Sequence, residues 1–592
     1  MTFMRMKNGG AALLVAVVLA ACGGDEGPPE ELRPPLTGNA AERPEPGGTA
    51  VLAEPNDLEL PMPLVWQSSL DSDIVDIMYM GLTRGAWRNG RLEYLLSEES
   101  PMAMAWHWEY ATPDSASLRY RMRSALRWSD GKPITAHDVV WTYGMFKDKR
   151  VASPRQEDVA AVDSVKAEND STVVFYFARR SPEMHFASGM TIAPRHQFEA
   201  AGPGGIRTHP SLTDPTRLVV SGAFRIGAWK AGERITFVPN PHFRPAPRLQ
   251  SIVIRVVPEM TTRLVELQTG NVDMVRGLAT DRIPGLRQRA PNLRFEREAR
   301  RFWEFVAYNP EKVEAFRDPQ VRRALGMAID VPRIIRSLQL TEFTEPSGGP
   351  YPPIFKDVYD RQRMRPLAFD SAGARRILAA RGWKDTDGDG VLDKDGKPFR
   401  FTMLSNSGNQ RRADVGLVLQ QQWKALGVDA RLQQQEFNTF MSRQVEKDYE
   451  AVLGGWGVNL NPDVTPLFAA DAQLNIVSYK DTVGQRLMRQ AKEQPTPEKA
   501  NPLWRAAAER IVQEQPYTWL YFYDQVDAVS DRLRGIHIDT YGAYQNAWEW
   551  WIPRARQGRG APSVTAAEPA KDSAPNQALG TRHQALSTPG TE

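Results

Sequence analysis

The chain has 592 residues, which is too long for one ordinary hydrophobic core and predicts two or three domains. Hydrophobic residues make up 41% and charged residues 24% of the sequence, the balance of a soluble globular protein. The formal net charge is only +3 and no stretch is densely basic, so the composition argues against a nucleic-acid-binding surface.

The N-terminus has the pattern of an export signal. Arg5 and Lys7 precede an apolar run at 11–21, which is too short to cross a bilayer but has the length of a signal-peptide core. Small residues precede Cys22, the only cysteine, and "LAAC" resembles a bacterial lipobox. We expect a lipoprotein signal peptide at 1–21 and lipidation of Cys22. An ordinary signal peptide with a chance cysteine is the alternative.

Two segments have compositions typical of unstructured chain. Residues 22–46 are rich in Pro, Glu and Gly and predict a flexible tether. Residues 555–592 are rich in Ala, Pro, Ser, Thr and Gln without an apolar period, and predict a disordered tail. No second apolar run is long enough to cross a membrane.

The region between them alternates strand and helix patterns. Residues 126–143 predict a strand, an Asp-Gly turn and a helix capped by Thr135 and Asp138. Runs of β-branched and aromatic residues predict strands at 171–177 and 250–258. Residues 261–275 and 417–435 each predict a helix, a glycine stop and a following strand, and 317–335 and 369–383 predict capped helices. This alternation predicts α/β domains.

An aspartate-rich stretch resembles a calcium-binding loop. "DTDGDGVLD" provides four acids at the required spacing, namely Asp385, Asp387, Asp389 and Asp393. The twelfth position, which supplies a bidentate acid in such loops, is Gly396. A structural calcium site and a surface turn without an ion both remain open.

Motifs of catalysis are missing from the sequence. The histidines have no metal-ligand spacing, and we find neither a Gly-x-Ser-x-Gly elbow nor a phosphate loop. We therefore expect no enzyme activity and no cofactor apart from the optional calcium. A hydrolase with paired carboxylates in a cleft is the least favoured alternative.

Nine stretches carry a family resemblance when they are taken in order. They are residues 47–55, 77–82, 126–143, 221–233, 267–274, 307–330, 382–393, 449–463 and 513–523. The third contains Asp-Gly-x-x-x-Thr-Ala-x-Asp-Val. From about residue 47 to residue 553, the chain resembles the extracytoplasmic solute-binding proteins of the peptide/nickel class, the family 5 binding components of ABC importers.

The resemblance implies an α/β, two-lobed periplasmic-binding-protein fold of class II (cluster C) type. It assigns 47–83, 215–300 and 526–554 to lobe I, 84–214 to an extra small subdomain on lobe I, and 301–525 to lobe II. Ligand is expected to bind in the cleft between the lobes, and hinge closure is expected to bury it.

Candidate ligand contacts follow from the same likeness. "VWQSSLD" matches a stretch of lobe I that contacts ligand in relatives, and it offers Trp66, Gln67 and Ser68. "LNIVSY" matches a cleft-facing stretch of lobe II, and it offers Asn475 and Tyr479. A solvated loop is the alternative for the first of these stretches.

The stretch "GGWGVNLNPD" is the most specific. In peptide-binding relatives a Trp at this place is followed three residues later by an Asp that pairs with the peptide ammonium. Here Trp456 is followed by Asn459, with Asp463 as a possible substitute. Because Asn offers a buried ammonium only a dipole, the resemblance supports a binding protein more strongly than a peptide ligand. Trp456 has two open interpretations, in the cleft or in the core.

The resemblance implies a function as well. It implies a substrate-binding lipoprotein of an ABC importer that captures a small polar ligand of oligopeptide type. The ligand is expected to pass to the transmembrane subunits of a permease, and ATPase subunits on other chains are expected to supply the energy. We expect an extracytoplasmic, lipid-anchored monomer. A ligand-sensing or cargo-chaperone protein of the same fold is the alternative, because its sequence would look the same.

Overall fold

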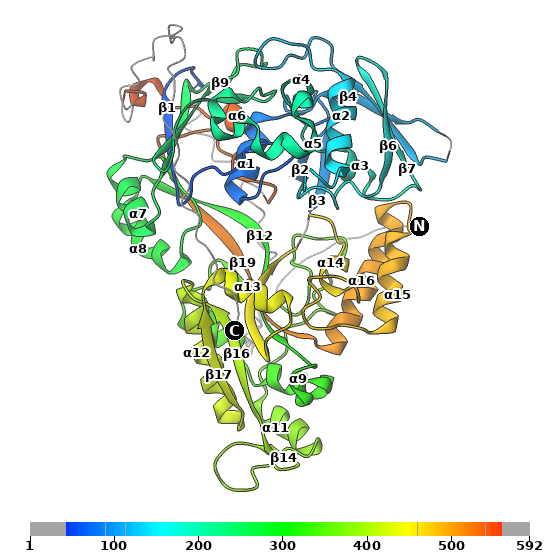
Figure 1. Ribbon diagram of the computed structural model, residues 1–592. Coiled ribbons are helices and arrows are strands. Elements are labelled where there is room, and N and C mark those ends of the chain that lie inside the picture. The colour runs from blue at the N-terminus through cyan, green and yellow to red at the C-terminus, as the bar shows by residue number, and fades with distance from the viewer. Residues whose placement is uncertain (1–42, 89, 113, 459, 539, 559–592) are drawn as a thin grey trace, which may run out of the picture.

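The computed structural model describes residues 43–558 except 89, 113, 459 and 539 (Figure 1). The predicted signal peptide, Cys22 and most of the predicted tether lie outside the described residues. Within the described part of the chain, no helix combines the length and apolarity needed to cross a bilayer.

One mixed sheet extends through both lobes. Its strands are β1 (Thr49–Glu54), β8 (Phe224–Lys230), β9 (Arg234–Pro239), β10 (Ser251–Val256), β11 (Met274–Val275), β12 (Leu293–Tyr308), β13 (Thr344–Pro346), β16 (Arg400–Asn406), β17 (Asp429–Gln435), β18 (Ala451–Gly457) and β19 (Tyr517–Ser530). Their order is β17-β16-β18-β12-β19-β11-β1-β10-β9-β8, and β13 also pairs with β19. The two-lobed α/β fold that the sequence predicts is therefore present (Figure 1).

The small subdomain has its own strands. A four-stranded sheet, in the order β4-β5-β7-β6, lies beside the hairpin β2–β3. The bounds are β2 (Arg84–Arg88), β3 (Arg91–Leu95), β4 (Ala105–Tyr110), β5 (Ser117–Met122), β6 (Val162–Asn169) and β7 (Thr172–Phe177). Buried side chains of the subdomain and of lobe I form one continuous core.

Helices cover the sheets in both lobes. Lobe I and the subdomain contain α1 (Ser69–Met78), α2 (Ala136–Lys147), α3 (Met184–Ser188), α4 (Arg195–Phe198), α5 (Gly202–Gly205), α6 (Pro210–Thr213), α7 (Met260–Thr269) and α8 (Ile283–Arg289). Lobe II contains α9 (Pro319–Met327), α10 (Val331–Ser337), α11 (Ser371–Ala380), α12 (Gln410–Leu426), α13 (Phe437–Val445), α14 (Thr465–Phe468), α15 (Thr482–Lys492) and α16 (Pro497–Glu514), together with the hairpin β14 (Asp393–Lys394) and β15 (Lys397–Pro398). Lobe II contains two separate hydrophobic cores.

Local start and stop signals act as the sequence predicts. The amide of Thr135 donates to Asp138 at 2.9 Å at the start of α2, and Gly270 ends α7 with a φ of +79°. The prediction of a strand directly before α2 is wrong. Only an isolated bridge joins Arg127 to Pro133, because the Asp-Gly turn between them leaves too little chain for a ladder.

Two long strands cross between the lobes. β12 pairs with β19 from Leu293 opposite Ser530 in lobe I to Ala307 opposite Tyr517 in lobe II, with an irregular register between Glu298 and Phe302. The predicted lobe boundaries, after residues 300 and 525, fall within these two strands. A third contact between the lobes precedes β13, because Phe343 packs into a core of lobe I.

The C-terminal end of the described chain packs against lobe I. Arg532 donates from Nε to the carbonyl of Arg556 at 3.0 Å, and Arg556 pairs with Asp531 at 2.8 Å. Residues 555–558 therefore belong to this packed end rather than to the predicted tail.

Candidate ligand-binding cleft

The carboxyl ends of the parallel strands of lobe I point toward lobe II. β1 is parallel to β10 and β11, whereas β11 is antiparallel to β19. Since β19 runs from lobe II into lobe I, the residue that ends β1 and the residue that follows β11 lie at the edge nearer lobe II. These residues are Glu54 and Arg276, and Asp527 of β19 is beside them. Open α/β sheets bind ligands at this kind of edge.

A partly buried ionic cluster forms where these side chains meet α1. Arg276 Nη1 is 2.5 Å from Asp73 Oδ2 and 3.7 Å from Glu54 Oε1, while its Nε is 3.6 Å from Asp527 Oδ2. The Tyr544 hydroxyl donates to Glu54, and its ring centre is 5.1 Å from the Arg276 guanidinium carbon. Burial raises the pKa of Glu54, although Arg276 and Tyr544 oppose that rise.

Asp76 extends the cluster by one helical turn toward the subdomain. Arg84 Nη1 is 3.5 Å from Asp76 Oδ1, and the guanidinium carbon is 5.6 Å from the centre of the Tyr541 ring. Burial raises the pKa of Asp76, and Arg84 opposes that rise. We use "the lobe I cluster" for the four carboxylates and two guanidinium groups of Glu54, Asp73, Asp76, Asp527, Arg84 and Arg276.

The facing edge of lobe II has the opposite charge balance. β18 is antiparallel to β12 and parallel to β16, so both β16 and β18 end toward lobe I, where α12 begins. Arg412 in the first turn of α12 pairs with the fully buried Glu304, and Arg411 lies 3.8 Å from the same carboxylate. The Arg411 guanidinium carbon is 4.1 Å from the centre of the Tyr523 ring. Two guanidinium groups therefore share one carboxylate here.

A cavity of about 180 Å³ lies between the subdomain and lobe II. Its walls are mainly aromatic and apolar, with charged groups among them. The aromatic members are Trp87, Tyr94, Phe186, Phe355 and Trp504, and the charged members are Arg91, Glu183, Asp357 and Glu498. A mostly apolar space with a few fixed polar groups is typical of small-ligand sites.

Two direct contacts bridge this gap. Arg91 of β3 pairs with Asp357 of lobe II, with Nε 2.6 Å and Nη2 2.8 Å from the two carboxylate oxygens. Beside it, the Trp87 ring meets Phe355 edge-on at a centroid distance of 5.3 Å. The hairpin β2–β3 is therefore one part of the subdomain that touches lobe II, and Arg179 also donates to the carbonyl of Lys492 at 3.3 Å.

The predicted lobe I contacts lie just before and at the start of α1. Ser68 caps that helix by accepting from the amide of Asp71 at 3.0 Å, so its hydroxyl has a structural partner. Trp66 is half-buried, with the Arg155 guanidinium carbon 4.9 Å from its ring centre, and Gln67 is exposed. Ligand contact by these residues stays a prediction.

The predicted lobe II residues mostly support the fold. Asn475 is 1% exposed and exchanges hydrogen bonds with the backbone of Tyr479, which is also buried. Asp463 accepts from Thr465 and pairs with Lys492 at 3.4 Å. Their assignment as ligand contacts has no geometric support beyond the proximity of the cavity, whose walls include the neighbouring Asn461 and Pro462.

Trp456 belongs to the core of lobe II. It is 8% exposed, its ring stacks on Phe305 at 6.0 Å, and its Nε1 donates to the Tyr517 hydroxyl at 3.3 Å. Of its two predicted interpretations, the structure shows core packing. Asn459, three residues later, lies outside the described residues.

Sequence reasoning missed the lobe I cluster entirely. Its acids and arginines come from β1, α1, β2, the end of β11 and β19, which are far apart in the chain. The only local signal was Glu54 at the end of a recognisable buried strand. The pairing of the strands, rather than a motif, brings these groups together.

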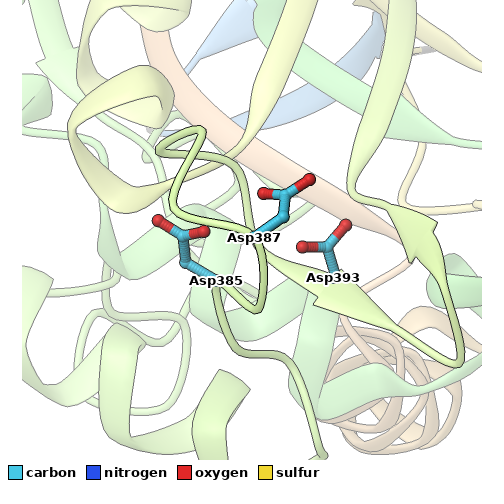
Figure 2. A group of neighbouring side chains, drawn as sticks. All are labelled: Asp385, Asp387 and Asp393. Carbon is cyan, nitrogen blue, oxygen red and sulfur yellow. The ribbon is translucent and has the colours of Figure 1, made fainter.

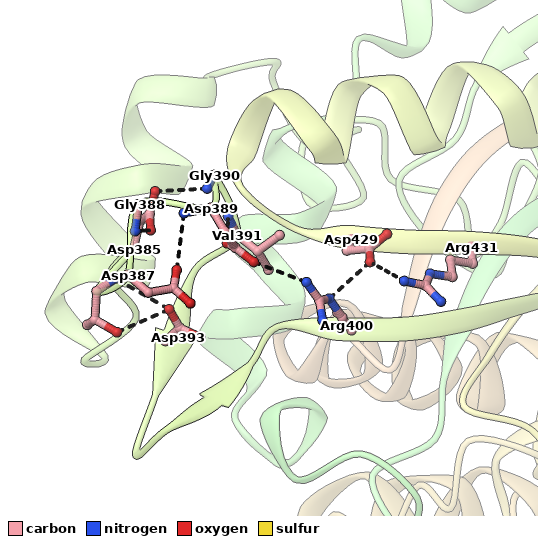
Figure 3. Close-up of polar contacts among 11 residues, drawn as sticks. Asp385, Asp387, Gly388, Asp389, Gly390, Val391, Asp393, Arg400, Asp429 and Arg431 are labelled. Atoms are coloured by element: carbon pink, nitrogen blue, oxygen red, sulfur yellow. Dashed lines mark hydrogen bonds and ion pairs between the residues drawn. The ribbon is translucent and has the colours of Figure 1, made fainter.

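Three of the four aspartates in the predicted calcium loop gather at one point. Asp385, Asp387 and Asp393 each offer an oxygen within 4.8 Å of the others (Figure 2). Asp389 instead pairs with Arg400 at 3.1 Å (Figure 3), and its role as a ligand stays a prediction. Calcium at this loop stays a prediction. It lies beside β14, at the tip of lobe II away from lobe I (Figure 1), so any ion there is structural.

Asp385 is already engaged with its own loop. Its two oxygens accept from the amides of Gly388 at 2.7 Å and Gly390 at 3.1 Å (Figure 3). Asp393 accepts from Thr386 in the same way. These bonds hold the turn closed without requiring an ion.

Comparisons with known proteins agree with this architecture. The chain is 26% identical over 525 residues to the oligopeptide-binding protein AppA of Bacillus subtilis, covering 87% of this chain and 93% of that protein. The solved structure of that AppA with a nonapeptide superposes with a TM-score of 0.71 at 25% identity, over 86% of this chain and 100% of AppA.

A second solved structure shares the fold alone. NikZ of Campylobacter jejuni in complex with Ni(L-His) has a TM-score of 0.72 at 20% identity, over 85% of this chain and 99% of NikZ. The family model for bacterial extracellular solute-binding proteins, family 5 (middle), matches residues 101–475. The chain therefore belongs to family 5 of the bacterial extracellular solute-binding proteins.

Proposed function

We propose that this protein is the peptide-capturing component of an ABC importer. The observation that supports this most strongly is its 26% identity to an oligopeptide-binding protein across nearly the full length of both chains. The fold agrees, since two lobes joined by crossing strands face each other across a cavity. The protein binds its ligand without changing it chemically.

In this proposal, capture works by lobe closure. The ligand contacts the facing edges of both lobes, and the register irregularity of β12 between Glu298 and Phe302 gives the crossing strands a place to bend. Closure brings the hairpin β2–β3 onto lobe II, where Arg91 meets Asp357. The closed form then presents both lobes to the permease transmembrane subunits, and separate ATPase subunits supply the energy.

The location follows from the same proposal. Cleavage before Cys22 and lipidation of its thiol anchor the protein to the outer face of a membrane, and residues 23–46 provide reach. More than one acyl chain is needed for stable attachment, which bacterial lipoproteins carry.

The direct test combines ligand identification with a measurement of shape. We expect native mass spectrometry of the purified protein to show bound peptide. Partial unfolding and refolding removes the peptide. We expect small-angle scattering to give a smaller radius of gyration for the peptide-bound protein than for the peptide-free protein. A bound solute that is not a peptide would contradict the peptide assignment. Equal dimensions with and without ligand would contradict closure.

A further inference from the structure

We propose that the cavity between the subdomain and lobe II binds the cationic side chain of a lysine or arginine in the captured peptide. This inference rests on the proposed function and specifies its substrate class as basic peptides. Small-ligand sites in proteins span about 300–1,000 Å³. This cavity is smaller, at about 180 Å³, so it takes one side chain rather than a whole peptide.

Carboxylates outnumber cationic groups on the cavity walls. Three acids line it, namely Glu183, Asp357 and Glu498, together with one cation, Arg91. Both oxygens of Asp357 already bind Arg91. Among the residues that the structure describes, neither Glu183 nor Glu498 forms an ion pair. The walls therefore keep a formal charge of −2 when all four groups are ionised.

Other cations near the cavity are engaged elsewhere. Lys492 pairs with Asp463 at 3.4 Å, and Arg505 Nη2 donates to the backbone carbonyl of Asp357 at 2.6 Å. Lys356 is exposed, so water and salt screen its ammonium. The protein thus supplies no dedicated counter-ion for the two remaining carboxylates within the described part of the chain.

The helix α16 brings its first turns to the cavity. Its N-terminal dipole is equivalent to about +0.5 elementary charge, which opposes a cation, but the full negative charge of Glu498 in the first turn outweighs it. Asn501 and Trp504 follow at intervals of three residues and line the same space. One face of α16 therefore offers an acid, an amide and an indole ring.

Glu183 provides an acid from the other side of the gap, in the subdomain. It is half-buried. Burial raises the pKa of its carboxyl, and the nearby Asp463 adds to that rise, although Lys492 opposes it. A cation from the ligand would favour the ionised form of Glu183. A cation in this cavity lies among acids from both the subdomain and lobe II.

Aromatic rings line the cavity from both sides as well. Trp87 and Tyr94 come from the hairpin β2–β3, and Phe355 and Trp504 come from lobe II. The faces of such rings attract an ammonium or guanidinium group, and Trp does so most strongly. Apolar walls also cover the methylene stem of a lysine or arginine. An apolar stem with a cationic head therefore matches both the rings and the acids.

The test compares peptides that differ in a single side chain. The refolded, peptide-free protein is mixed with an equimolar pool of nonapeptides made of glycine, alanine and serine. Each peptide carries one lysine, arginine, norleucine or glutamate at a varied position, and mass spectrometry quantifies what is retained. Norleucine keeps the apolar stem of lysine without its charge. We expect the wild type to retain lysine and arginine peptides at least tenfold over norleucine peptides, and glutamate peptides least.

Variants assign the preference to the cavity. We expect Glu183→Gln and Glu498→Gln each to lower the ratio of lysine to norleucine peptides at least threefold, and the double variant to bring it near one. Glu183→Lys should lower the ratio of lysine to glutamate peptides more than Glu183→Gln does. Glu509→Gln is the matched control, because it removes an acid of the same helix that pairs with Arg363 at 2.6 Å, and it keeps the wild-type ratio. Circular dichroism restricts the comparison to folded variants.

The outcomes distinguish this inference from the proposed function. Equal retention of lysine, arginine and norleucine peptides by the wild type overturns the cationic pocket but leaves peptide capture intact. An unchanged ratio in both folded glutamine variants also overturns it, because the preference then arises elsewhere in the cleft. If no peptide of the pool is retained, the proposed function fails and this inference fails with it.

Discussion

The side chain of Trp456 packs in the hydrophobic core of lobe II instead of lining the cleft. It stacks on Phe305, bonds to Tyr517 and is 8% exposed, although the strand that carries it ends at the cleft. Trp456 therefore lies in the core behind the edge of lobe II that faces the cleft. Its sequence context, a Gly-rich strand end, is compatible with either role.

We predict that Trp456→Ala destabilises the ligand-free protein by roughly 3–5 kcal/mol, because it leaves a cavity among aromatic rings. Urea unfolding followed by circular dichroism measures this loss. Trp106→Ala is the matched control, since Trp106 is 46% exposed, and we expect a much smaller change there. Similar free energies of unfolding for the two variants would contradict core packing and would favour a position for Trp456 in the cleft.

His185 gives the subdomain a dependence on pH. Its ring lies against Trp108 at 4.4 Å and Tyr94 at 5.8 Å, and burial lowers its pKa from 6.5 to about 4. The unfolded chain therefore binds a proton between pH 6.5 and 4 that the folded chain does not bind. Stability from this group is complete above pH 6.5 and is lost as the pH falls toward 4.

We predict that His185→Gln reduces the stability lost between pH 7 and pH 4.5 by roughly 2–3 kcal/mol relative to wild type. Urea denaturation at the two pH values measures the difference for each protein. His107→Gln, at a half-exposed ring, is the control. An equal pH dependence in wild type and His185→Gln would contradict the assignment.

At the scale of elements, the hairpin β2–β3 carries an ion pair from the subdomain to lobe II. Arg91 and Asp357 have side chains that are 60% and 31% exposed, so their pair contributes at most about 1 kcal/mol to the contact between the subdomain and lobe II. The edge-on contact of Trp87 with Phe355 adds apolar burial beside it.

We predict that Asp357→Asn raises the dissociation rate of a bound peptide by up to about fivefold, because it weakens only the closed form. Stopped-flow fluorescence measures the rate, and high salt should reproduce the effect in the wild type. Glu342→Gln serves as control, since its ion pair with Arg287 lies elsewhere. A faster rate in both variants would indicate a nonspecific charge effect.

Elements whose ends are marked locally were predictable from the sequence. The Thr135–Asp138 box, the Asp318 cap and the left-handed Gly270 each act over a few residues, and each is present. The start of α12 was placed seven residues late, because its cap is Asn409, which the apolar pattern does not reveal. Contacts between residues that are close in the sequence set these boundaries, so short stretches of sequence are enough to predict them.

At the scale of the whole molecule, the family resemblance identified the two-lobed fold, but the site needed the structure. Glu54 and Tyr544 form a hydrogen bond across 490 positions of the chain. Arg276 pairs with Asp73, which lies 203 residues earlier in the chain. Pairings of this kind depend on strand order, which no periodicity or spacing in one sequence expresses.

The pairing of β12 with β19 in both lobes has a consequence for how the two halves of the molecule can move. An antiparallel ribbon twists and bends with little resistance, but its ladder of hydrogen bonds opposes stretching and sliding. The halves of the molecule are thus constrained to swing along nearly one path. A longer guest would stop that swing earlier than a short one, so under the proposed function the angle between the lobes would depend on the length of the guest.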